Sequence, residues 1–517
     1  MGKTSAEADK QEFDARDASS LSLPVRAPDA AEPVADSGEG KLKMIVGLVK
    51  KCLGVKDIAT MRISLPASLL EPIPNLEYWN YLDRPDVFAA INDSDDSLMR
   101  MVAVLRFTFT KDLKFVHGKI CKPYNSVLGE YFRCHTSFTP LTYPADPNEP
   151  PIFPTHTLTS QNASLAPPDQ VPSETASVRS TTSTSGPNAA RSHKHRSASG
   201  ASAGLNGTAE GADSKEAEGD TNDDDRVRVV FLTEQVSHHP PISSFYITAP
   251  ERGIEACGVD QIAAKVVGTS VRVTPGSSNQ GIFITLTKGP GEGEKYRITH
   301  NSANVNGVLR GQFYATMSDS TIITCDRPGK DSLRAVIEYK EEVAGVSSSW
   351  IGRSQFLVEG VIHTYDPSTP DECASWTKVK NVPQSRVVAT FDGTWRGLIK
   401  WKRAGSADTH TLVDLNALAI LPKRVRPVEQ QLPNESHRLW EYVTKNLLSK
   451  NYSEATRVKQ NIEQKQRDDA AARKAKSEEF VPVYFEPDIS NGQPVLTAAG
   501  RKVVEEELAL AAALPTS

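Results

Sequence analysis

The stretch from Arg226 to about Trp401 constrains the fold of this chain more than any other part of its 517 residues. Apolar and polar residues alternate in short segments, which clusters of Gly, Pro, Asn and Asp separate at hairpin-like intervals. The clearest segments are residues 226–236, 281–289, 320–326, 333–342, 354–365 and 386–395. Many sequential strands of this kind predict a large antiparallel meander, and meanders of that size tend to close into barrels.

Helical patterns flank the predicted sheet. Residues 41–56 (KLKMIVGLVKKCLGVK) place apolar residues at helical spacing with lysines between them, which predicts a short basic amphipathic helix. A second helical pattern spans residues 97–116 and follows a capping-like acidic run. Residues 436–480 form a highly charged helical segment with a thin apolar stripe, and residues 499–513 a short helical tail.

Two stretches have too few large apolar side chains to fold. Residues 1–40 are rich in Ala, Asp, Glu, Ser and Pro, and we expect a disordered tail there. The second stretch, from about residue 146 to 225, begins with prolines and is rich in Ser, so it predicts a disordered insertion. We therefore expect one domain at residues 41–488, interrupted by this insertion, and a C-terminal helical tail at residues 489–517.

The bulk composition limits the classes of function. The formal net charge is −5 and the pI about 6.2, so no overall basic field indicates nucleic-acid binding. The six cysteines have no Cys-x-x-Cys spacing, which predicts reduced thiols in a cytosolic protein. No segment approaches the roughly 18 consecutive apolar residues of a membrane-spanning helix. We therefore expect that any membrane contact is peripheral.

The most informative segment is EQVSHHPP, residues 234–241. The two prolines forbid a helix, so His238 and His239 are predicted to lie on a rigid extended turn at the end of a strand. Paired donors held in this way suit an anionic group such as a phosphate. A metal site would need further ligands, which neither an HxxxH spacing nor a cysteine pair supplies. Alternatively, both histidines only satisfy backbone groups at the turn.

The same string is the signature of the oxysterol-binding-protein-related lipid-transfer family, which this chain resembles. Residues 122–130 (KPYNSVLGE) are similar to the family's KPxNPxLGE motif, with Ser126 where proline is usual. Further similar segments are residues 392–395 (DGTW), 435–440 (ESHRLW) and 459–467 (KQNIEQKQR). The resemblance follows the family order over roughly residues 41–145 and 226–488, and is to a short-form, fungal-like member.

The resemblance implies an α+β fold with a large incomplete antiparallel β-barrel around a hydrophobic tunnel, an N-terminal lid helix and flanking N- and C-terminal helices. The basic amphipathic segment 41–56 would then be the lid. The implied lid and tunnel-entrance residues are Leu42, Ile45, Val49, Leu53, Ile63 and Leu65. Lysines beside an apolar stripe suit an anionic membrane surface, although a core helix packed on the barrel would show the same pattern.

The resemblance also implies a headgroup site for phosphatidylinositol 4-phosphate, which would occupy the tunnel in alternation with a second lipid. The implied contacts are Lys122, Asn125, His238, His239, Lys459, Glu463 and Arg467. The last three residues follow at intervals of four and share one face of a helix, so that Glu463 can hold the two cations or bond an inositol hydroxyl group. Without the family, the same spacing is typical of a solvated ladder of salt bridges.

We therefore expect a carrier without cofactor or metal, which exchanges sterol or phosphatidylserine for phosphatidylinositol 4-phosphate between membranes. Sterol is the family default, whereas KPYN before LGEYFRC and NYSEAT before ARKAKSEEF resemble the branch associated with phosphatidylserine. A lipid sensor or scaffold that binds the same ligands without net transport is the alternative. The expected location is the cytoplasm, peripheral at contact sites of the endoplasmic reticulum, Golgi or plasma membrane.

Two further patterns bear on enzymes and partners. Residues 200–204 (GASAG) match the GxSxG string of serine hydrolases, but they lie in the predicted insertion without a preceding strand or a following helix. We therefore do not expect an enzyme. Residues 12–17 (EFDARD) resemble a degenerate two-phenylalanine acidic motif that docks proteins onto endoplasmic-reticulum receptors, and coincidence in an acidic tail is the alternative.

Overall fold

The computed structural model describes residues 70–117, 122–153, 226–307, 314–327, 332–340 and 356–513, together with Gly47, Gly54, Val55 and Ala67. The predicted N-terminal tail, including residues 12–17, lies outside the described residues. So do the six predicted lid and entrance residues, Leu42, Ile45, Val49, Leu53, Ile63 and Leu65.

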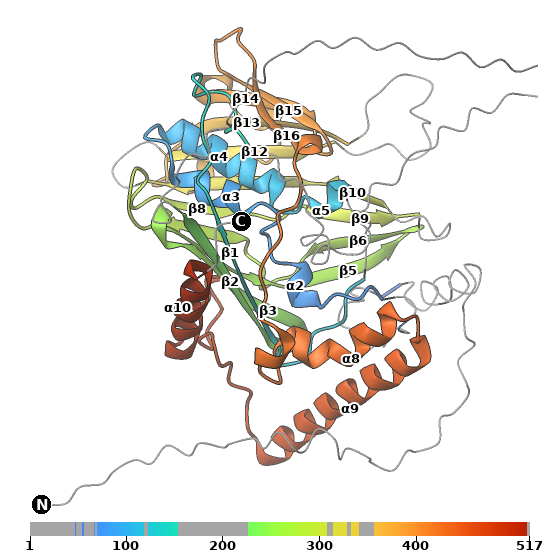
Figure 1. Cartoon of the computed structure of the whole chain (residues 1–517). Coiled ribbons are helices and arrows are strands. Elements are labelled where there is room, and N and C mark those ends of the chain that lie inside the picture. The colour runs from blue at the N-terminus through green and yellow to red at the C-terminus, as the bar shows by residue number, and fades with distance from the viewer. Residues whose placement is uncertain are drawn as a thin grey trace, which may run out of the picture.

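A sheet of twelve antiparallel strands dominates the structure (Figure 1). In their spatial order, the strands are β1 (Tyr131–Phe138), β2 (Val227–His238), β3 (Pro241–Ala249), β4 (Ile254–Asp260), β7 (Ile282–Leu286), β8 (Lys295–Ile298), β11 (Ser320–Asp326), β12 (Ser332–Tyr339), β13 (Leu357–Tyr365), β14 (Val387–Thr394), β15 (Leu398–Arg403) and β16 (His410–Asp414). The two edge strands do not pair with each other within the described residues. The sheet is therefore not closed, which confirms the prediction of a large incomplete antiparallel barrel.

Two hairpins leave this meander and form a second sheet. They consist of β5 (Ile262–Val267) with β6 (Ser270–Pro275), and of β9 (Ser302–Asn306) with β10 (Tyr314–Ser318). The order in this four-stranded sheet is β10-β9-β6-β5. Because the hairpins depart after β4 and after β8, the larger sheet keeps the order of the chain with two interruptions.

Helices fill and flank the sheet, as expected for the α+β class. Their bounds are α2 (Asn75–Tyr78), α3 (Pro85–Ala89), α4 (Ser97–Thr110), α5 (Lys114–His117), α7 (Pro370–Ala374), α8 (Ser436–Leu448), α9 (Tyr452–Lys476) and α10 (Ala498–Ala512). Within the described residues, no helix combines the length and the apolar character that crossing a membrane requires.

Helix α4 is enclosed on every side, since 12 of its 14 residues are buried. It begins where the side chain of Asp96 accepts a hydrogen bond from Leu98 N at 2.8 Å, which satisfies one of the free amides of the first turn. Its two arginines are held inside the protein: Arg100 binds Glu294 through two hydrogen bonds of 2.8 and 2.6 Å, and Arg106 Nε donates to Leu412 O at 2.9 Å. A helix buried all round in this way is a central element of a core.

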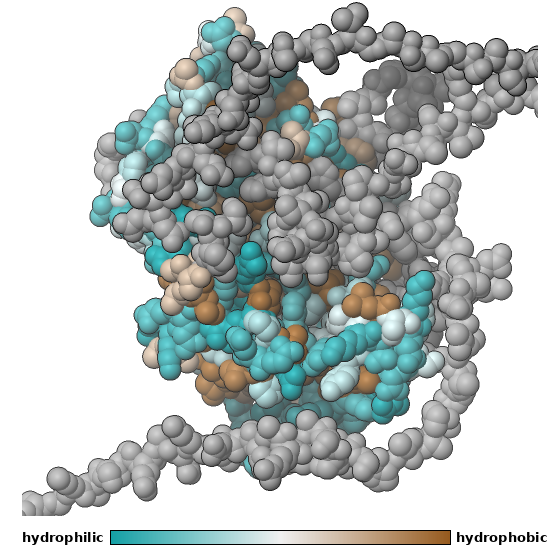
Figure 2. Space-filling model, viewed as in Figure 1, coloured by the Kyte–Doolittle hydropathy of each residue, from teal (hydrophilic) through white to brown (hydrophobic). Residues whose placement is uncertain are grey.

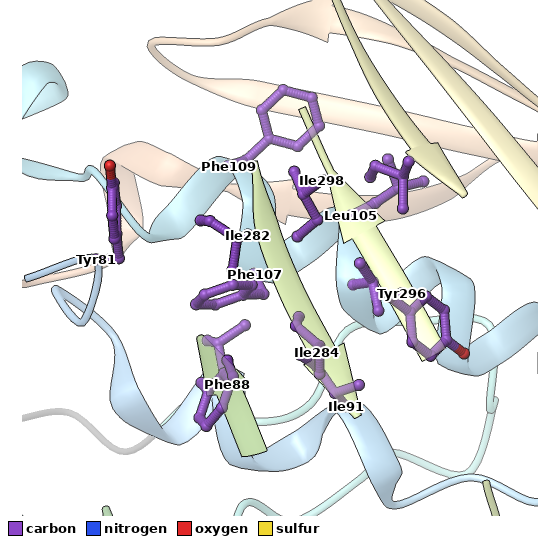
Figure 3. Packing of buried hydrophobic residues seen from close by; sticks show 14 of the residues in the cluster. Tyr81, Phe88, Ile91, Leu105, Phe107, Phe109, Ile282, Ile284, Tyr296 and Ile298 are labelled. Atoms are coloured by element: carbon purple, nitrogen blue, oxygen red, sulfur yellow. The ribbon is translucent and has the colours of Figure 1, made fainter. Parts of the chain in front are cut away.

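The main hydrophobic core lies between α3, α4 and the sheet (Figure 3). Phe88 and Phe107 from the helices pack in the same cluster as Ile282, Ile284 and Ile298 from β7 and β8. Alternate residues of β7 are buried, as the period of a strand requires. Each such side chain contributes about 1.5–3 kcal/mol through its burial.

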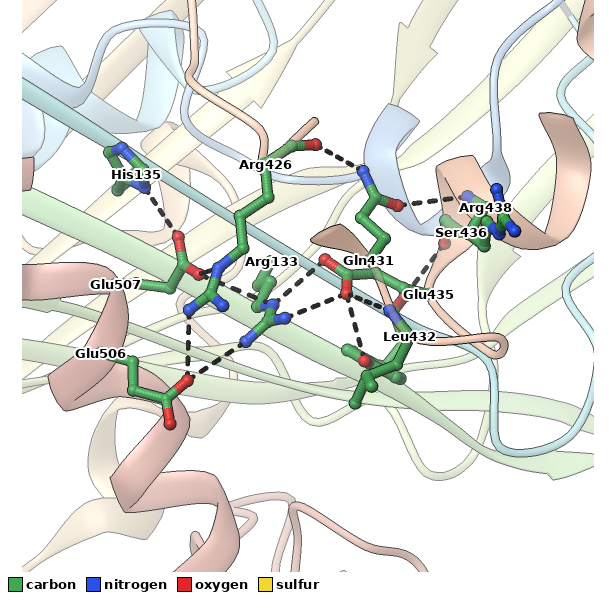
Figure 4. A network of polar contacts seen from close by, with 11 residues as sticks. Arg133, His135, Arg426, Gln431, Leu432, Glu435, Ser436, Arg438, Glu506 and Glu507 are labelled. Carbon is green, nitrogen blue, oxygen red and sulfur yellow. Dashed lines mark hydrogen bonds and ion pairs between the residues drawn. The ribbon is translucent and has the colours of Figure 1, made fainter. Parts of the chain in front are cut away.

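Helix α10 packs on β1 and β2 and is fastened by a buried ionic network (Figure 4). Glu507 accepts a hydrogen bond from Arg426 Nε at 2.6 Å, and its other carboxylate oxygen lies 2.7 Å from His135 Nδ1. Arg133 of β1 binds Glu435 through two hydrogen bonds of 3.0 Å. Burial tends to raise the pKa of Glu507, but His135 and Arg426 outweigh it and lower that pKa. Helix α10 of the predicted C-terminal tail therefore packs on the strands of the barrel.

The first residues of the predicted insertion also contact the barrel. Asn148 O accepts a hydrogen bond from Trp401 Nε1 at 3.1 Å, and a carboxylate oxygen of Glu149 accepts one from Thr411 N at 3.3 Å. Polar groups of this segment thus satisfy polar groups of β15 and β16, which no apolar pattern in the sequence reveals. Residues 148 and 149 of the predicted insertion therefore contact the barrel, and residues 154–225 lie outside the described residues.

Candidate functional site

The loop of residues 122–130 is fixed at its start by backbone hydrogen bonds. Glu71 N donates to Lys122 O at 3.1 Å, and Tyr124 N donates to Ile73 O at 3.2 Å. The side chains of Lys122 and Asn125 are exposed, and Lys122 Nζ donates to Asn125 Oδ1 at 2.7 Å. The predicted motif residues thus form one polar unit on the surface of a fixed loop.

The end of the same loop joins strand β2. Gly129 N donates to Gln235 O at 2.9 Å, and Gln235 N donates to Glu130 O at 2.8 Å. Gln235 precedes His238 by three residues on this strand. These backbone bonds therefore place the end of the loop close to the predicted histidine pair.

Glu130 connects the loop to helix α8 from a fully buried position. One carboxylate oxygen accepts a hydrogen bond from Val127 N at 3.0 Å, and the other accepts one from Ser436 Oγ at 2.7 Å. Burial raises the pKa of Glu130 to about 7, although the hydrogen bonds from Ser436 and Val127 act in the opposite direction. The shape of the loop thus depends on a carboxyl group that titrates near neutral pH.

The two histidines lie at the tip of the β2–β3 hairpin. Strand β2 ends at His238 and β3 begins at Pro241, so that His239 and Pro240 form the turn. The two imidazole rings lie 4.4 Å apart between centroids, and Ser237 Oγ donates to Pro240 O at 2.8 Å. The structure thus places both rings on a tight turn at the end of a strand.

The third predicted group lies on α9, and only part of it is assembled. Lys459 Nζ donates to Glu463 Oε1 at 2.6 Å, and the side chain of Lys459 is only 4% exposed. Arg467 is exposed and donates instead to Gln464 Oε1 at 2.8 Å. Glu463 therefore binds Lys459, as expected, whereas the long Arg467 side chain turns to its neighbour Gln464.

Loop 122–130 and the α8–α9 pair meet in one apolar cluster. Tyr124 packs on Trp440 with ring centroids 4.9 Å apart, and the hydroxyl groups of Tyr124 and Thr444 lie 2.9 Å apart. Val458 and Ile462 of α9 pack against the same cluster. The segments that carry the predicted headgroup residues are therefore joined at one end of the molecule, although more than 300 residues separate Tyr124 from Thr444 in the chain.

The four-stranded sheet has one apolar and one polar face, because directly paired residues share a face. The apolar wall, as we call the first face, consists of Ile262, Ala264, Val266, Val271, Val273, Ala303, Val305, Ala315 and Met317. All but Ala315 keep some accessible surface. The other face carries residues such as Lys265, Arg272 and Asn304. An antiparallel sheet normally buries its apolar face, so a wall left partly accessible is a candidate ligand surface.

A polar cluster lies near one end of the apolar wall. The Tyr81 hydroxyl donates to Asp260 Oδ1 at 2.7 Å, and its ring stacks on His300 at 5.6 Å between centroids. Burial raises the pKa of Asp260 to about 7 and lowers the pKa of His300 to about 3. Lys111 and Asp112, which pair with each other beside this cluster, nevertheless keep 11% and 18% of their side chains accessible. Figure 3 shows Tyr81 at the margin of the main core.

Sequence reasoning missed both the apolar wall and the polar cluster. The alternation of Ile262, Ala264 and Val266 with polar or small residues was a usable signal for a strand, but alanine weakens it. The residues of the polar cluster come from separate segments of the chain, so no local spacing could bring them together.

A comparison with protein families and known proteins agrees with this arrangement. The family model described as oxysterol-binding protein matches residues 44–165 and 218–506. Oxysterol-binding protein-like protein 1 of Schizosaccharomyces pombe is 41% identical over 94% of this chain and 96% of its own length. Oxysterol-binding protein-related protein 11 of Homo sapiens is 27% identical over 78% of this chain and 43% of its own length.

Two solved structures share the fold. The Osh1 ORD domain in complex with cholesterol has a TM-score of 0.54 and 16% identity, covering 89% of this chain and 88% of its own. The Osh3 ORD in complex with PI(4)P from Saccharomyces cerevisiae has a TM-score of 0.52 and 14% identity, covering 90% of this chain and 93% of its own. At these identities the likeness concerns the fold alone. The family model and the 41% identical relative, which both span most of the chain, show that this protein belongs to the oxysterol-binding protein family.

Proposed function

We propose that this chain is a lipid-transfer protein that shelters one lipid at a time in an internal tunnel along the apolar wall. It exchanges a cargo lipid for phosphatidylinositol 4-phosphate between two membranes, and it carries out no chemical reaction on either. The single observation that carries this proposal is the apolar wall, whose valine, isoleucine, alanine and methionine side chains remain partly accessible in a chain of this family.

The free energy of water exclusion favours such a carrier. Each methylene group that leaves water for an apolar surface contributes about 0.8 kcal/mol, so an acyl chain or a sterol ring system gains several kcal/mol on the wall. Two solved structures of similar fold are complexes of other proteins, one with cholesterol and one with PI(4)P. A tunnel that takes either kind of lipid here is consistent with both.

The headgroup of phosphatidylinositol 4-phosphate would bind at the end of the molecule where loop 122–130 meets β2 and α8–α9. Lys122 and Asn125 are exposed on this loop, and the imidazoles of His238 and His239 lie together at the hairpin tip. A phosphate would accept charge-assisted hydrogen bonds from these donors and from Lys459, which Glu463 orients. Arg467 would join the site through a change of rotamer away from Gln464.

The polar cluster favours sterol over phosphatidylserine as the cargo. The pKa of His300 is about 3, so this imidazole is neutral at physiological pH, and its Nε2 has no hydrogen-bond partner within the described residues. A neutral ring nitrogen beside Asp260 and Tyr81 suits a hydroxyl group, which both donates and accepts.

The proposed location is the cytoplasm, with peripheral contact at the endoplasmic reticulum, Golgi or plasma membrane. Docking of the N-terminal residues 12–17 onto an endoplasmic-reticulum receptor stays a prediction from the sequence.

Mass spectrometry of the lipids that co-purify with the full chain tests the proposal. We expect one lipid per chain, a sterol in the first place, which added phosphatidylinositol 4-phosphate displaces in equal amount. Simultaneous binding of both lipids, or purified protein that takes up neither from vesicles, would rule out the exchange mechanism. Co-purified phosphatidylserine in place of sterol would reject the cargo assignment alone.

A further inference from the structure

One face of helix α8 is exposed and combines apolar with cationic side chains. Spacings of three and four residues place Arg438, Tyr442, Lys445 and Leu448 on this face, and Lys450 follows just after the helix. Tyr442 is 64% exposed and Leu448 is 57% exposed. We call these five residues the α8 outer face.

The charge of the α8 outer face is positive. Its acidic neighbour Glu441 accepts hydrogen bonds from Arg438 Nη1 at 3.2 Å and from Lys445 Nζ at 2.6 Å, so this carboxylate is shared between two cations. Lys445 Nζ also lies 5.8 Å from the centroid of the Tyr442 ring. The charge of Glu429 also acts on Lys445. Three cations and two carboxylates therefore surround two large exposed apolar side chains, and the net charge of the face stays positive.

The backbone at Lys450 gives a second indication. Its φ is +58°, in the left-handed region, where a glycine is accommodated at a lower cost than a lysine. The positive charge of Lys450 lies next to the C-terminal end of α8, where a cation is favourable for the helix and remains exposed to solvent.

We propose that the α8 outer face docks onto an anionic lipid surface and so orients the headgroup site toward the membrane. Tyrosine is enriched at the interface between water and lipid, and cations beside an apolar stripe are attracted by anionic lipids. Single exposed apolar residues are common and need no explanation, but here two of them share one face with three cations. Figure 2 shows hydrophobic patches that interrupt the hydrophilic surface over the region of α8 and α9.

The position of α8 links this surface to the site. Its inner side carries Trp440, which packs on Tyr124, and Thr444, whose hydroxyl lies 2.9 Å from the Tyr124 hydroxyl. Tyr124 belongs to the loop that carries Lys122 and Asn125. Since a helix with its side chains is about 10 Å across, a bilayer on the outer face lies about one helix diameter from this loop.

Flotation of the full chain with phosphatidylcholine vesicles, with and without phosphatidylserine, tests the proposal. The variant K445A/K450A should bind the anionic vesicles about 25-fold more weakly, because each lysine near such a surface contributes about fivefold. Binding to the neutral vesicles should not change in this variant. The variant Y442A/L448A should bind both kinds of vesicle more weakly, because it loses apolar contact instead of charge.

A matched control lies on β15, at the opposite end of the molecule (Figure 1). Leu398 is 38% exposed there, and Lys402 follows on the same strand and is also exposed. The variant L398A/K402A removes similar chemistry and should bind both kinds of vesicle like the unmodified protein. All three variants should keep the unmodified melting temperature, since the replaced side chains are exposed.

The docking proposal rests on the proposed lipid transfer, but the two fail in different ways. Water-soluble short-chain phosphatidylinositol 4-phosphate reaches the site without a membrane, so the α8 variants should bind it normally. If the unmodified protein does not bind this lipid, the proposed function fails. If the α8 variants bind anionic vesicles as tightly as the unmodified protein, the docking proposal is overturned, and a protein partner would then explain the exposed face.

Discussion

The imidazoles of His238 and His239 lie at a hairpin tip whose conformation is set by its flanking strands and by Ser237 and Pro240. Replacing both rings therefore removes donors and leaves the fold intact. H238A/H239A should abolish extraction of phosphatidylinositol 4-phosphate from vesicles and spare the binding of cargo lipid. His410, on β16, provides the control, since H410A should extract the phosphoinositide normally. Unchanged extraction by the double variant would refute the headgroup assignment.

Ser126 occupies the position where the family motif has proline, and its buried hydroxyl group lowers the stability of the folded state. The residue is 6% exposed, and its Oγ has no hydrogen-bond partner within the described residues. A buried polar group in this state costs about 1–3 kcal/mol. S126A should therefore raise the free energy of unfolding by about 1 kcal/mol in urea titrations.

The matching control is S237A, which removes a hydroxyl that donates to Pro240 O at 2.8 Å. The free energy of unfolding of this variant should be equal to or lower than that of the unmodified protein. A loss of stability in S126A would instead show that the Ser126 hydroxyl is satisfied, for example by an ordered water molecule.

At the scale of elements, the joint between loop 122–130 and α8 should respond to pH through Glu130. The pKa of this carboxyl group is about 7 in the folded protein, against an ordinary value of 4.5. Between these two values the folded state binds more protons than the unfolded state, so stability falls as the pH rises through this window. The stabilisation is fully present below about pH 4.5 and is lost above about pH 7.

The variant E130Q removes this titration and keeps the shape of the side chain. At about pH 8 it should be more stable than the unmodified protein by about 2–3 kcal/mol, and the difference should shrink toward about pH 5. Thermal unfolding across this range measures the effect. The exposed Glu505 on α10 is the control, and E505Q should not change the pH dependence. If the stability of E130Q and that of the unmodified protein changed equally with pH, the role of Glu130 would be contradicted.

The elements differ in how far the sequence predicts them. Strands β2 and β7 repeat large apolar residues at every second position, and β11 to β14 continue the alternation with smaller residues such as Ala335 and Ala389 among them, so the meander can be predicted from local periodicity. The α9 spacing of Lys459 and Glu463 predicts their contact, but Arg467 turns toward Gln464, since a long exposed side chain has several partners within reach. Glu130 connects loop 122–130 to α8, and Glu507 connects α10 to β1. Both connections are contacts between distant segments, so no local sequence pattern predicts them.

At the scale of the whole molecule, both flanks of the predicted insertion are held close to the end of β1. Ile152 N donates to Thr142 O at 2.8 Å, and Arg226 Nε donates to Ser137 Oγ at 2.9 Å. A short Gly/Ser linker can therefore replace residues 154–225. We expect the barrel of this variant to unfold cooperatively. Its free energy of unfolding should rise by about 1–2 kcal/mol, because closing a shorter loop costs less entropy. Calorimetry that shows loss of the cooperative transition would mean that the insertion is structural.

In the proposed mechanism, loop 122–130, the β2–β3 hairpin and α8–α9 act together, so that the protein carries one lipid and exchanges it for another. Transfer of a fluorescent sterol between two vesicle populations tests this claim most directly. We expect the full chain to move sterol faster when the acceptor vesicles contain phosphatidylinositol 4-phosphate, and H238A/H239A to lose this acceleration while it still binds sterol. Tight binding of both lipids without any transfer would contradict the account and identify the protein as a lipid sensor.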